Sequence, residues 1–308
     1  MEDSANNDVT GDFISPTLLN PGDIHSIQWR DTGLAVSKNG YIMGLSPRLR
    51  ESLLDYCDYM GIATMMRNLT SKRQQQRPRT DENLKVQLRG FDWFIQRSPS
   101  GQHWNSNMHW ISPLNSESYN DYLKALGNAG FDEVLEAIGT RFGYRGLVAY
   151  HLSFIAVSKC DHGSIHVDAT STGTKAMNII IPLVLVEGGD HCFPELNLRD
   201  DQVVDGQGKR RVGKLRYQHN IAALLGDDVY HGTSSVDYLL VKQGEMRLAA
   251  TVYVADVSYA NVSAILDDHV TYKLSYPPRN DPGVLMSLAG SHWKRDDSTK
   301  KLPKSNST

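Results

Sequence analysis

The sequence contains few cysteines and no long apolar run. Its 308 residues include three cysteines, Cys57, Cys160 and Cys192, and no two of them form a C-x-x-C pair. A small, odd number of scattered cysteines excludes a disulfide framework and favours a reducing compartment. The longest apolar run, Ile179–Val186, has eight residues, which is too few for a membrane-spanning helix.

The sequence also has no excess of charge of one sign. Lys and Arg number 32 against 35 Asp and Glu, which gives a formal net charge of -3, so no global positive field attracts nucleic acid or anionic lipid. The first residues, Met1–Ser4, are acidic and polar where a signal peptide is basic and then apolar. We therefore expect a soluble intracellular protein, cytoplasmic or nuclear, with no membrane partner.

Composition shifts along the chain predict one folded domain between two disordered ends. Residues 1–25 are polar and lack periodicity, which predicts a disordered leader, and residues 291–308 predict a disordered basic tail. No long linker interrupts residues 26–290, so we expect a single domain there. Its expected parts are a helical, substrate-side part at 26–144, a β-rich core at 145–257, and a C-terminal helix and extension at 258–290.

Helical patterns lie in the first half of the chain. Ser46-Pro47 is typical of a helix N-terminus, and apolar residues then recur at helical spacing up to Met60, before Gly61. A second helical pattern covers 116–141, and Gly127 and Gly130 are expected to divide it.

Strand patterns follow Gly143. They are short, rich in β-branched residues and separated by Gly and Asp turns: 147–158, 165–168, 177–186, 220–225, 238–242 and 245–255. Helices followed by strands predict an α+β chain with an N-terminal helical layer packed on an antiparallel sandwich or barrel.

A His-x-Asp triplet is the first sign of chemistry. In a strand, residues i and i+2 point to the same face, so His166 and Asp168 would project together into the interior of a barrel. Such a triplet also occurs by chance, as a polar pair on a surface strand. A second histidine, His231, follows a Gly-Asp turn after the predicted strand at 220–225, which strengthens the case for a shared site.

The last predicted strand carries an arginine among small residues. On one face lie Arg247, Ala249, Thr251 and Tyr253, and burying a guanidinium without a partner is costly. Arg247 is therefore expected to bind an anionic ligand, and a planar guanidinium suits a carboxylate. The alternative is a buried salt bridge, for which the sequence offers Glu187, Asp227 and Asp237.

Two histidines and one carboxylate on one side of a metal leave three coordination positions open. This arrangement is expected for non-haem Fe(II) that binds a co-substrate and O₂ together. With an arginine placed to hold a distal carboxylate, the set predicts a keto-acid co-substrate. His162, His191 and His219 are rival histidines in the same region. His162 lies four residues before His166, a helical spacing that does not suit a loop and strand, and His191-Cys192 has no partner pair nearby.

The order of these residues resembles that of the Fe(II)/2-oxoglutarate-dependent oxygenases. His166-Val167-Asp168 is followed by Gly188-Gly189, by Phe193-Pro194, by a Gly-Asp turn before His231, and by a strand that bears Arg247. The resemblance covers about residues 145–257. It implies a double-stranded β-helix fold of the jelly-roll or cupin-like kind.

The resemblance also implies roles for individual residues. His166, Asp168 and His231 would bind Fe(II), Arg247 would bind the C5 carboxylate of 2-oxoglutarate, and Thr251 would assist it. From their places on the predicted strands, Tyr150 and Asn178 are further candidates for a hydrogen bond to the co-substrate. Hydroxylation of a substrate, with decarboxylation of 2-oxoglutarate to succinate, is the expected reaction.

The substrate is left open between a small molecule, a protein side chain and a nucleic-acid base. Oxygenases of modified bases belong to the same superfamily, and some of their relatives use ascorbate in place of 2-oxoglutarate. The basic run Arg67–Arg79 is a candidate contact to nucleic acid, or else a solvated loop. The aromatic segment 91–110 is either core of the helical layer or a lid over the substrate.

Two other functional classes remain. A non-catalytic β-helix could bind a ligand without turnover. A protein that had lost its activity would tolerate the loss of a metal-ligand residue, so the complete set of ligands and Arg247 count against this class. A cupin-type metal dioxygenase or isomerase would need no keto acid, and Arg247 would then have no role.

Overall fold

The structure is a computed structural model. It describes residues 9–13, 19–62, 64, 84–88, 90–96, 107–113, 116–144, 146–160, 165–168, 173–185, 195–204, 210–237, 246–256, 286–289 and 292–295.

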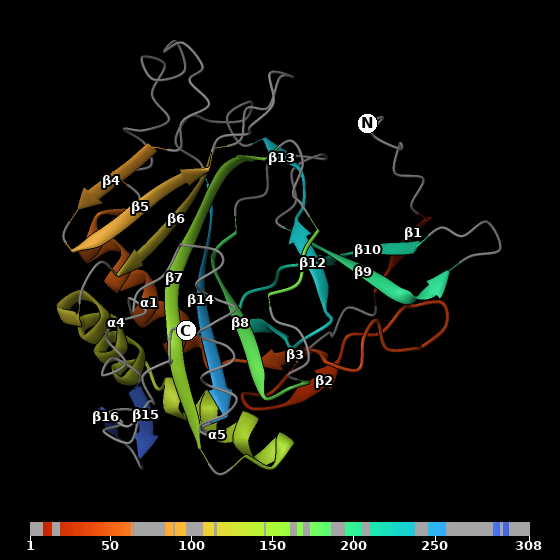
Figure 1. Cartoon of the computed structure of the whole chain (residues 1–308), viewed down its shortest axis with the longest axis horizontal. Coiled ribbons are helices and arrows are strands. Elements are labelled where there is room, and N and C mark those ends of the chain that lie inside the picture. The colour runs from red at the N-terminus through yellow and green to blue at the C-terminus, as the bar shows by residue number, and fades with distance from the viewer. Residues whose placement is uncertain are drawn as a thin grey trace, which may run out of the picture.

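Two sheets face one another and form the body of the protein (Figure 1). The small sheet has four strands in the order β1 (Val9–Asp12), β10 (Arg210–Arg216), β9 (Glu195–Val204) and β12 (Tyr230–Thr233). All its pairings are antiparallel except that of β1 with β10.

The large sheet is antiparallel throughout its described pairings. Its strands follow the order β2 (Ile24–Ser26), β3 (Gly40–Gly44), β11 (Ile221–Leu225), β8 (Ala176–Val184), β14 (Arg247–Asp256), β7 (Leu147–Cys160), β6 (Asn107–Pro113), β5 (Phe91–Gln96) and β4 (Leu84–Leu88). The short strands β13 (Val236–Asp237) and β15 (Met286–Ala289) pair with β7, and β16 (His292–Arg295) pairs with β15.

The central strands of the large sheet are buried on both faces. In β14, Leu248, Ala250 and Val252 belong to a core shared with the helices, whereas Ala249 belongs to a second core shared with Leu198 of the small sheet. The alternation predicted for this strand is therefore confirmed. Two facing sheets with helices outside one of them form a jelly roll, or double-stranded β-helix, of the α+β class.

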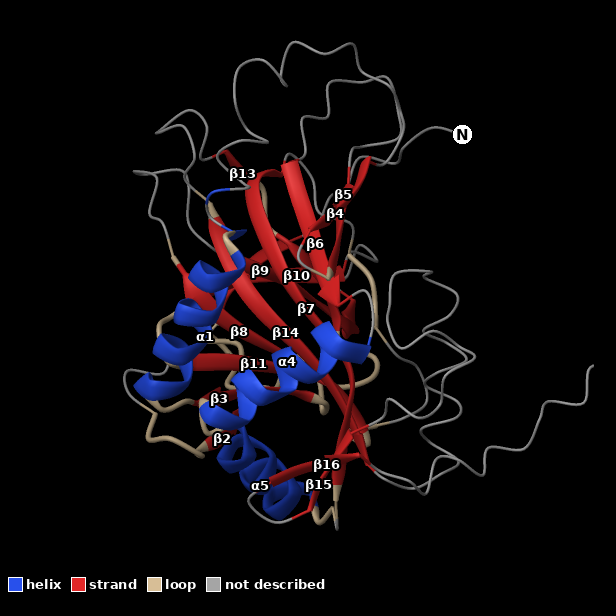
Figure 2. Ribbon diagram, turned by 90° about the vertical axis from the view of Figure 1, so that its left-hand side faces the viewer, coloured by secondary structure: helices blue, strands red, loops and turns tan. Residues whose placement is uncertain are grey.

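Three helices cover the outer face of the large sheet (Figure 2): α1 (Pro47–Met60), α4 (Ser116–Asn128) and α5 (Phe131–Phe142). The hydroxyl oxygen of Ser46 accepts a hydrogen bond from the backbone N–H of Leu49 and caps α1, which ends at Gly61 in the left-handed region, with φ of 70°. Gly130, with φ of 82°, separates α4 from α5. Both helical predictions are confirmed, and the break occurs at Gly130, whereas Gly127 lies within α4 and does not interrupt it.

Tyrosines of α4 attach the helical layer to β7. The Tyr119 hydroxyl donates to the carbonyl oxygen of Ala149 at 2.7 Å, and the Tyr122 hydroxyl donates to that of Ser153 at 3.2 Å. The Tyr122 ring stacks on Phe154 with 4.5 Å between the ring centroids. Burial raises the pKa of Tyr122 well above its usual value, so this hydroxyl stays protonated and remains a donor.

Several expectations need correction. Residues 26–144 are helical only in part, because they also contribute β3 and the three strands β4, β5 and β6 to the large sheet. The aromatic segment 91–110, expected in a helical layer or a lid, includes β5 and the first part of β6. Residues 165–168 make an isolated bridge from His166 to His231 and no regular strand.

The chain ends also differ in part from the expectation. Val9–Asp12 pairs with β10, so an unstructured leader does not hold for these residues. Likewise, Met286–Ala289 and His292–Arg295 form a strand pair where an extension and a disordered tail were expected. Three further predictions lie outside the described residues: the strand at 238–242, the C-terminal helix before residue 286, and the basic run Arg67–Arg79.

Across the described ranges, every helix is too short or too polar to cross a lipid bilayer.

Candidate metal centre

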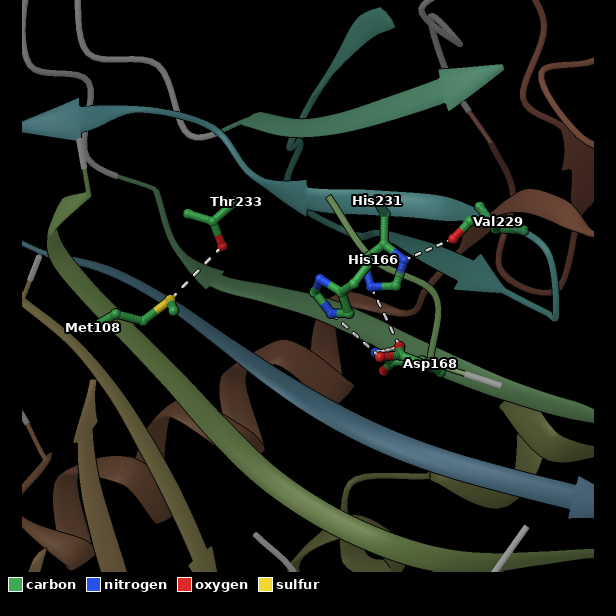
Figure 3. A network of polar contacts seen from close by, with 7 residues as sticks. Met108, His166, Asp168, Val229, His231 and Thr233 are labelled. Carbon is green, nitrogen blue, oxygen red and sulfur yellow. Dashed lines mark hydrogen bonds and ion pairs between the residues drawn. The ribbon is translucent and has the colours of Figure 1, made fainter. Parts of the chain in front are cut away.

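The site lies between the two sheets, where a loop meets β12. His166 and His231 exchange backbone hydrogen bonds, each N–H donating to the other residue's carbonyl oxygen at 2.9 Å. This bridge places the two imidazole rings side by side, with 4.7 Å between their centroids. Asp168 follows His166 by two residues, and its carboxylate turns toward both rings (Figure 3).

The three side chains converge on a small volume. Nε2 of His166 lies 3.5 Å from Oδ1 of Asp168, and Nε2 of His231 lies 3.3 Å from Oδ2. One ligand atom from each residue lies within 4.8 Å of the other two. Bonds from a metal to imidazole nitrogen or carboxylate oxygen measure about 2.0–2.2 Å, so one ion fits among these atoms.

A backbone carbonyl sets the orientation of His231. Its Nδ1 lies 2.9 Å from the carbonyl oxygen of Val229, which accepts hydrogen bonds and never donates them. Nδ1 therefore carries a hydrogen, and Nε2 is directed toward Asp168. Metal-binding histidines are held in this way in many proteins.

The turn before β12 is itself tied to the large sheet. The amide Nδ2 of Asn39 donates to Oδ1 of Asp227 at 2.7 Å and to its carbonyl oxygen at 3.2 Å. Asp228 takes the left-handed conformation, with φ of 57°. These contacts fix the turn that carries Val229 and His231.

The carboxylate of Asp168 is ionised. Burial alone would raise its pKa, but the electrostatic influence of the adjacent His231 and the hydrogen bonds to both imidazoles hold the pKa well below its usual value. In the metal-free protein the cluster thus consists of an ionised carboxylate and two imidazoles. Such a set of side chains favours the binding of a cation.

Asn178 supplies a further contact to the carboxylate. It lies in β8 on the inner face, is 3% exposed, and its Nδ2 donates to Oδ2 of Asp168 at 2.8 Å. The sequence predicts a hydrogen bond from Asn178 to a co-substrate; the structure directs its NH₂ group to Asp168 instead.

Arg247 is buried on the same inner face. Its Nη1 donates to the carbonyl oxygen of Glu195 at 2.9 Å, and its Cζ lies 5.2 Å from the centroid of the Tyr217 ring. Neither contact carries a negative charge. Asp227 is one of the three carboxylates that the sequence offers as salt-bridge partners of Arg247. Its carboxylate instead accepts a hydrogen bond from Nδ2 of Asn39.

The other predicted residues have different positions. Thr251 is fully buried in β14, and its hydroxyl is hydrogen-bonded to the hydroxyl of Ser153 in β7. Tyr150 lies in β7, and its side chain is outside the described part of the structure. His219 lies exposed in the turn before β11, whereas His162 and His191 are outside the described residues.

Three supporting groups were not predicted. The backbone carbonyl oxygens of Val229 and Glu195 could not be predicted from the sequence, because every residue has a backbone carbonyl. Tyr217, near the guanidinium, follows β10, in which Leu215 lies between the exposed Lys214 and Arg216; this short alternation was the signal that could have revealed it.

Comparisons with known proteins are distant. No family model matches the sequence, and no curated protein matches it. Among solved structures, AviO1 from Streptomyces viridochromogenes Tue57 is 14% identical, with a TM-score of 0.43 over 71% of this chain and 90% of that chain. The non-heme alpha ketoglutarate dependent epimerase SnoN from nogalamycin biosynthesis is 11% identical, with a TM-score of 0.40 over 71% and 78%. A Pseudomonas putida prolyl-4-hydroxylase is 14% identical, with a TM-score of 0.35 over 70% and 92%.

Proposed function

We propose that this protein is an Fe(II)- and 2-oxoglutarate-dependent oxygenase that hydroxylates an organic substrate. In the balanced reaction, substrate, 2-oxoglutarate and O₂ yield hydroxylated substrate, succinate and CO₂. The observation that carries the proposal is the convergence of His166, Asp168 and His231 between two sheets, where Arg247 is also buried on the inner face of β14.

The residues fit the metal. Two imidazoles and one carboxylate are the donor set expected for non-haem Fe(II) with open positions, and the carbonyl of Val229 directs Nε2 of His231 toward the common centre. Bound Fe(II) and 2-oxoglutarate would supply the oxidising chemistry. The protein supplies the orientation of the ligands.

Arg247 supports a dicarboxylic co-substrate. It is 3% exposed, and its contacts to Glu195 and Tyr217 leave its positive charge without a countercharge among these neighbours. A buried guanidinium is favourable when it pairs with an anion. The distal carboxylate of 2-oxoglutarate is such an anion, and Thr251 and Tyr150 are proposed to lie beside it on neighbouring strands.

An anaerobic titration tests this proposal. Wild-type protein with Fe(II) and 2-oxoglutarate should develop the weak visible charge-transfer band of the iron chelate. His231→Ala should abolish the band, because only two ligands remain. A wild-type protein without the band would refute the proposal that 2-oxoglutarate is the co-substrate. Ascorbate would then be the next co-substrate to assay.

Substrate identity needs a second measurement. Succinate release can be screened over small molecules, peptides and nucleic acids, with Asp168→Ala as the blank. A nucleic-acid substrate is proposed only through Arg67–Arg79, which lies outside the described residues.

A further inference from the structure

Asn178 is placed so that its side chain reaches the carboxylate of the cluster. It lies near the start of β8, opposite Tyr253 of β14, and faces the interior between the sheets. Its Nδ2 donates to Oδ2 of Asp168 at 2.8 Å. This is a hydrogen bond to an ionised acceptor, a class that is stronger than bonds between neutral groups.

The direction of the Asn178 amide follows from chemistry. An ionised carboxylate only accepts hydrogen bonds, so the NH₂ end of the amide must face Asp168. The other end, Oδ1, is then buried, and no hydrogen-bond donor lies within reach of it among the described residues. A buried carbonyl without a donor is unfavourable. The hydrogen bond to Asp168 therefore forms although it leaves Oδ1 of the same amide buried without a donor among the described residues.

The contact divides the two carboxylate oxygens of Asp168. Oδ2 is held by Asn178 and also lies 3.3 Å from Nε2 of His231, whereas Oδ1 faces Nε2 of His166 at 3.5 Å. An aspartate side chain rotates readily about its last bond unless a neighbour fixes it. Fixing Oδ2 selects the rotation in which each imidazole faces one of the two carboxylate oxygens.

We propose that Asn178 is a positioning residue for the metal centre: it holds Oδ2 of Asp168 and so fixes the rotation of the carboxylate that would bind the metal. The inference rests on the proposed function, because it assumes that a metal binds the cluster. It goes further in assigning to Asn178 a role in metal affinity rather than in binding of the co-substrate.

Mn(II) binding without any keto acid tests the role directly. Asn178→Leu keeps approximately the shape of the side chain and removes its polar atoms, including the unsatisfied oxygen. We expect its Mn(II) dissociation constant, measured by calorimetric titration, to rise about 10–100-fold, the usual effect of losing a residue that orients a metal ligand. Asn178→Ser, whose hydroxyl is too short to reach Asp168, should show the same loss.

Ile180→Val is the matched control. Ile180 lies on the same face of the same strand and is 4% exposed, but it carries no polar group. A purely structural role for position 178 would lower the melting temperature of the metal-free protein without changing Mn(II) affinity, as we expect for Ile180→Val.

The possible outcomes separate this proposal from the proposed function. Wild-type protein that binds Mn(II) together with Asn178→Leu that binds it equally well or more tightly would overturn the role of Asn178 and leave the metal centre standing. Wild-type protein that binds no Mn(II) would overturn the metal centre, and the role of Asn178 with it.

Discussion

Arg247 reaches from β14 across the interior and donates a hydrogen bond from Nη1 to the carbonyl oxygen of Glu195 in β9, at 2.9 Å. That carbonyl also accepts a hydrogen bond from the Ser234 hydroxyl at 2.8 Å. The guanidinium is thus held at one edge, with its Cζ 5.2 Å from the centroid of the Tyr217 ring, and neither of these two contacts is with an anion.

Replacing Arg247 with Gln should weaken 2-oxoglutarate binding and leave metal binding intact. A hydrogen bond to a charged group contributes about 1.5–3 kcal/mol, and 1.4 kcal/mol corresponds to a factor of ten. We expect the dissociation constant to rise about 10–100-fold in an anaerobic titration of the chelate band. Arg216→Gln, which removes an exposed arginine of β10, is the control and should bind as wild type does. Equal affinity in both variants would contradict the role of Arg247.

Metal should stabilise the folded protein, and its removal should be measurable as a loss of melting temperature. A ligand that binds the folded state at 100 times its dissociation constant adds about 2.7 kcal/mol. For a domain of 150–250 residues, each kcal/mol raises the melting temperature by about 2–4 °C. We therefore expect Mn(II) to raise that of the wild type by at least about 5 °C, and chelator to reverse the shift.

The same experiment on Asp168→Ala and His231→Ala should give no shift, because two ligands hold the ion weakly. His219→Ala serves as the control, since His219 is exposed and lies in the turn before β11. A shift that survives in both cluster variants would place the metal elsewhere.

The strands that carry the predicted site residues were foreseeable from hydrophobicity. β14 begins with Arg247 and continues with mostly apolar residues, and alternation alone assigned Arg247, Ala249 and Thr251 to one face. Because a strand has a period of two residues, that assignment needs no tertiary information. The convergence of His166, Asp168 and His231 was predicted from residue types in order, and the two sheets bring them together.

The small sheet was not foreseeable in the same way. In β9, Leu196 and Leu198 face the core, but the strand continues with Arg199, Asp200 and Asp201, which read as loop. Asp200 is nevertheless 2% exposed, because its carboxylate accepts a hydrogen bond from Nε1 of Trp29 at 3.0 Å. A buried polar residue of this kind depends on a partner distant in the sequence, so local patterns do not reveal it.

Asn39 should contribute to stability through the turn that carries His231. It is 9% exposed and makes two hydrogen bonds to Asp227, which is 3% exposed. Asn39→Leu leaves a buried carboxylate with fewer donors, and we expect a loss of about 1–3 kcal/mol in the free energy of unfolding. Urea denaturation measures the loss. In the control, Asn20→Ala removes an exposed side chain bonded to Asp23 and should change stability by less than about 0.5 kcal/mol.

The buried thiols predict a dependence of stability on alkaline pH. Cys57 in α1 is 3% exposed and Cys160 in β7 is 2% exposed. Burial, and then the nearby negative charge of Asp58, raise the pKa of the Cys57 thiol well above its usual value. The folded state thus keeps the thiol protonated, whereas the unfolded chain ionises it above about pH 8.5. Stability from this group is complete below that pH and is lost progressively above it.

Cys57→Val removes this dependence, so the free energy of unfolding of the wild type should fall relative to that of Cys57→Val between pH 7.5 and 9.5, at most by about 1.4 kcal/mol per pH unit. In the native protein, iodoacetamide should modify Cys57 and Cys160 only after unfolding, as peptide mapping by mass spectrometry can show. Rapid modification of Cys57 at pH 7.5 would mean that α1 does not pack on the sheet as described. A constant difference between wild type and variant across the pH range would show instead that the thiol ionises equally in both states.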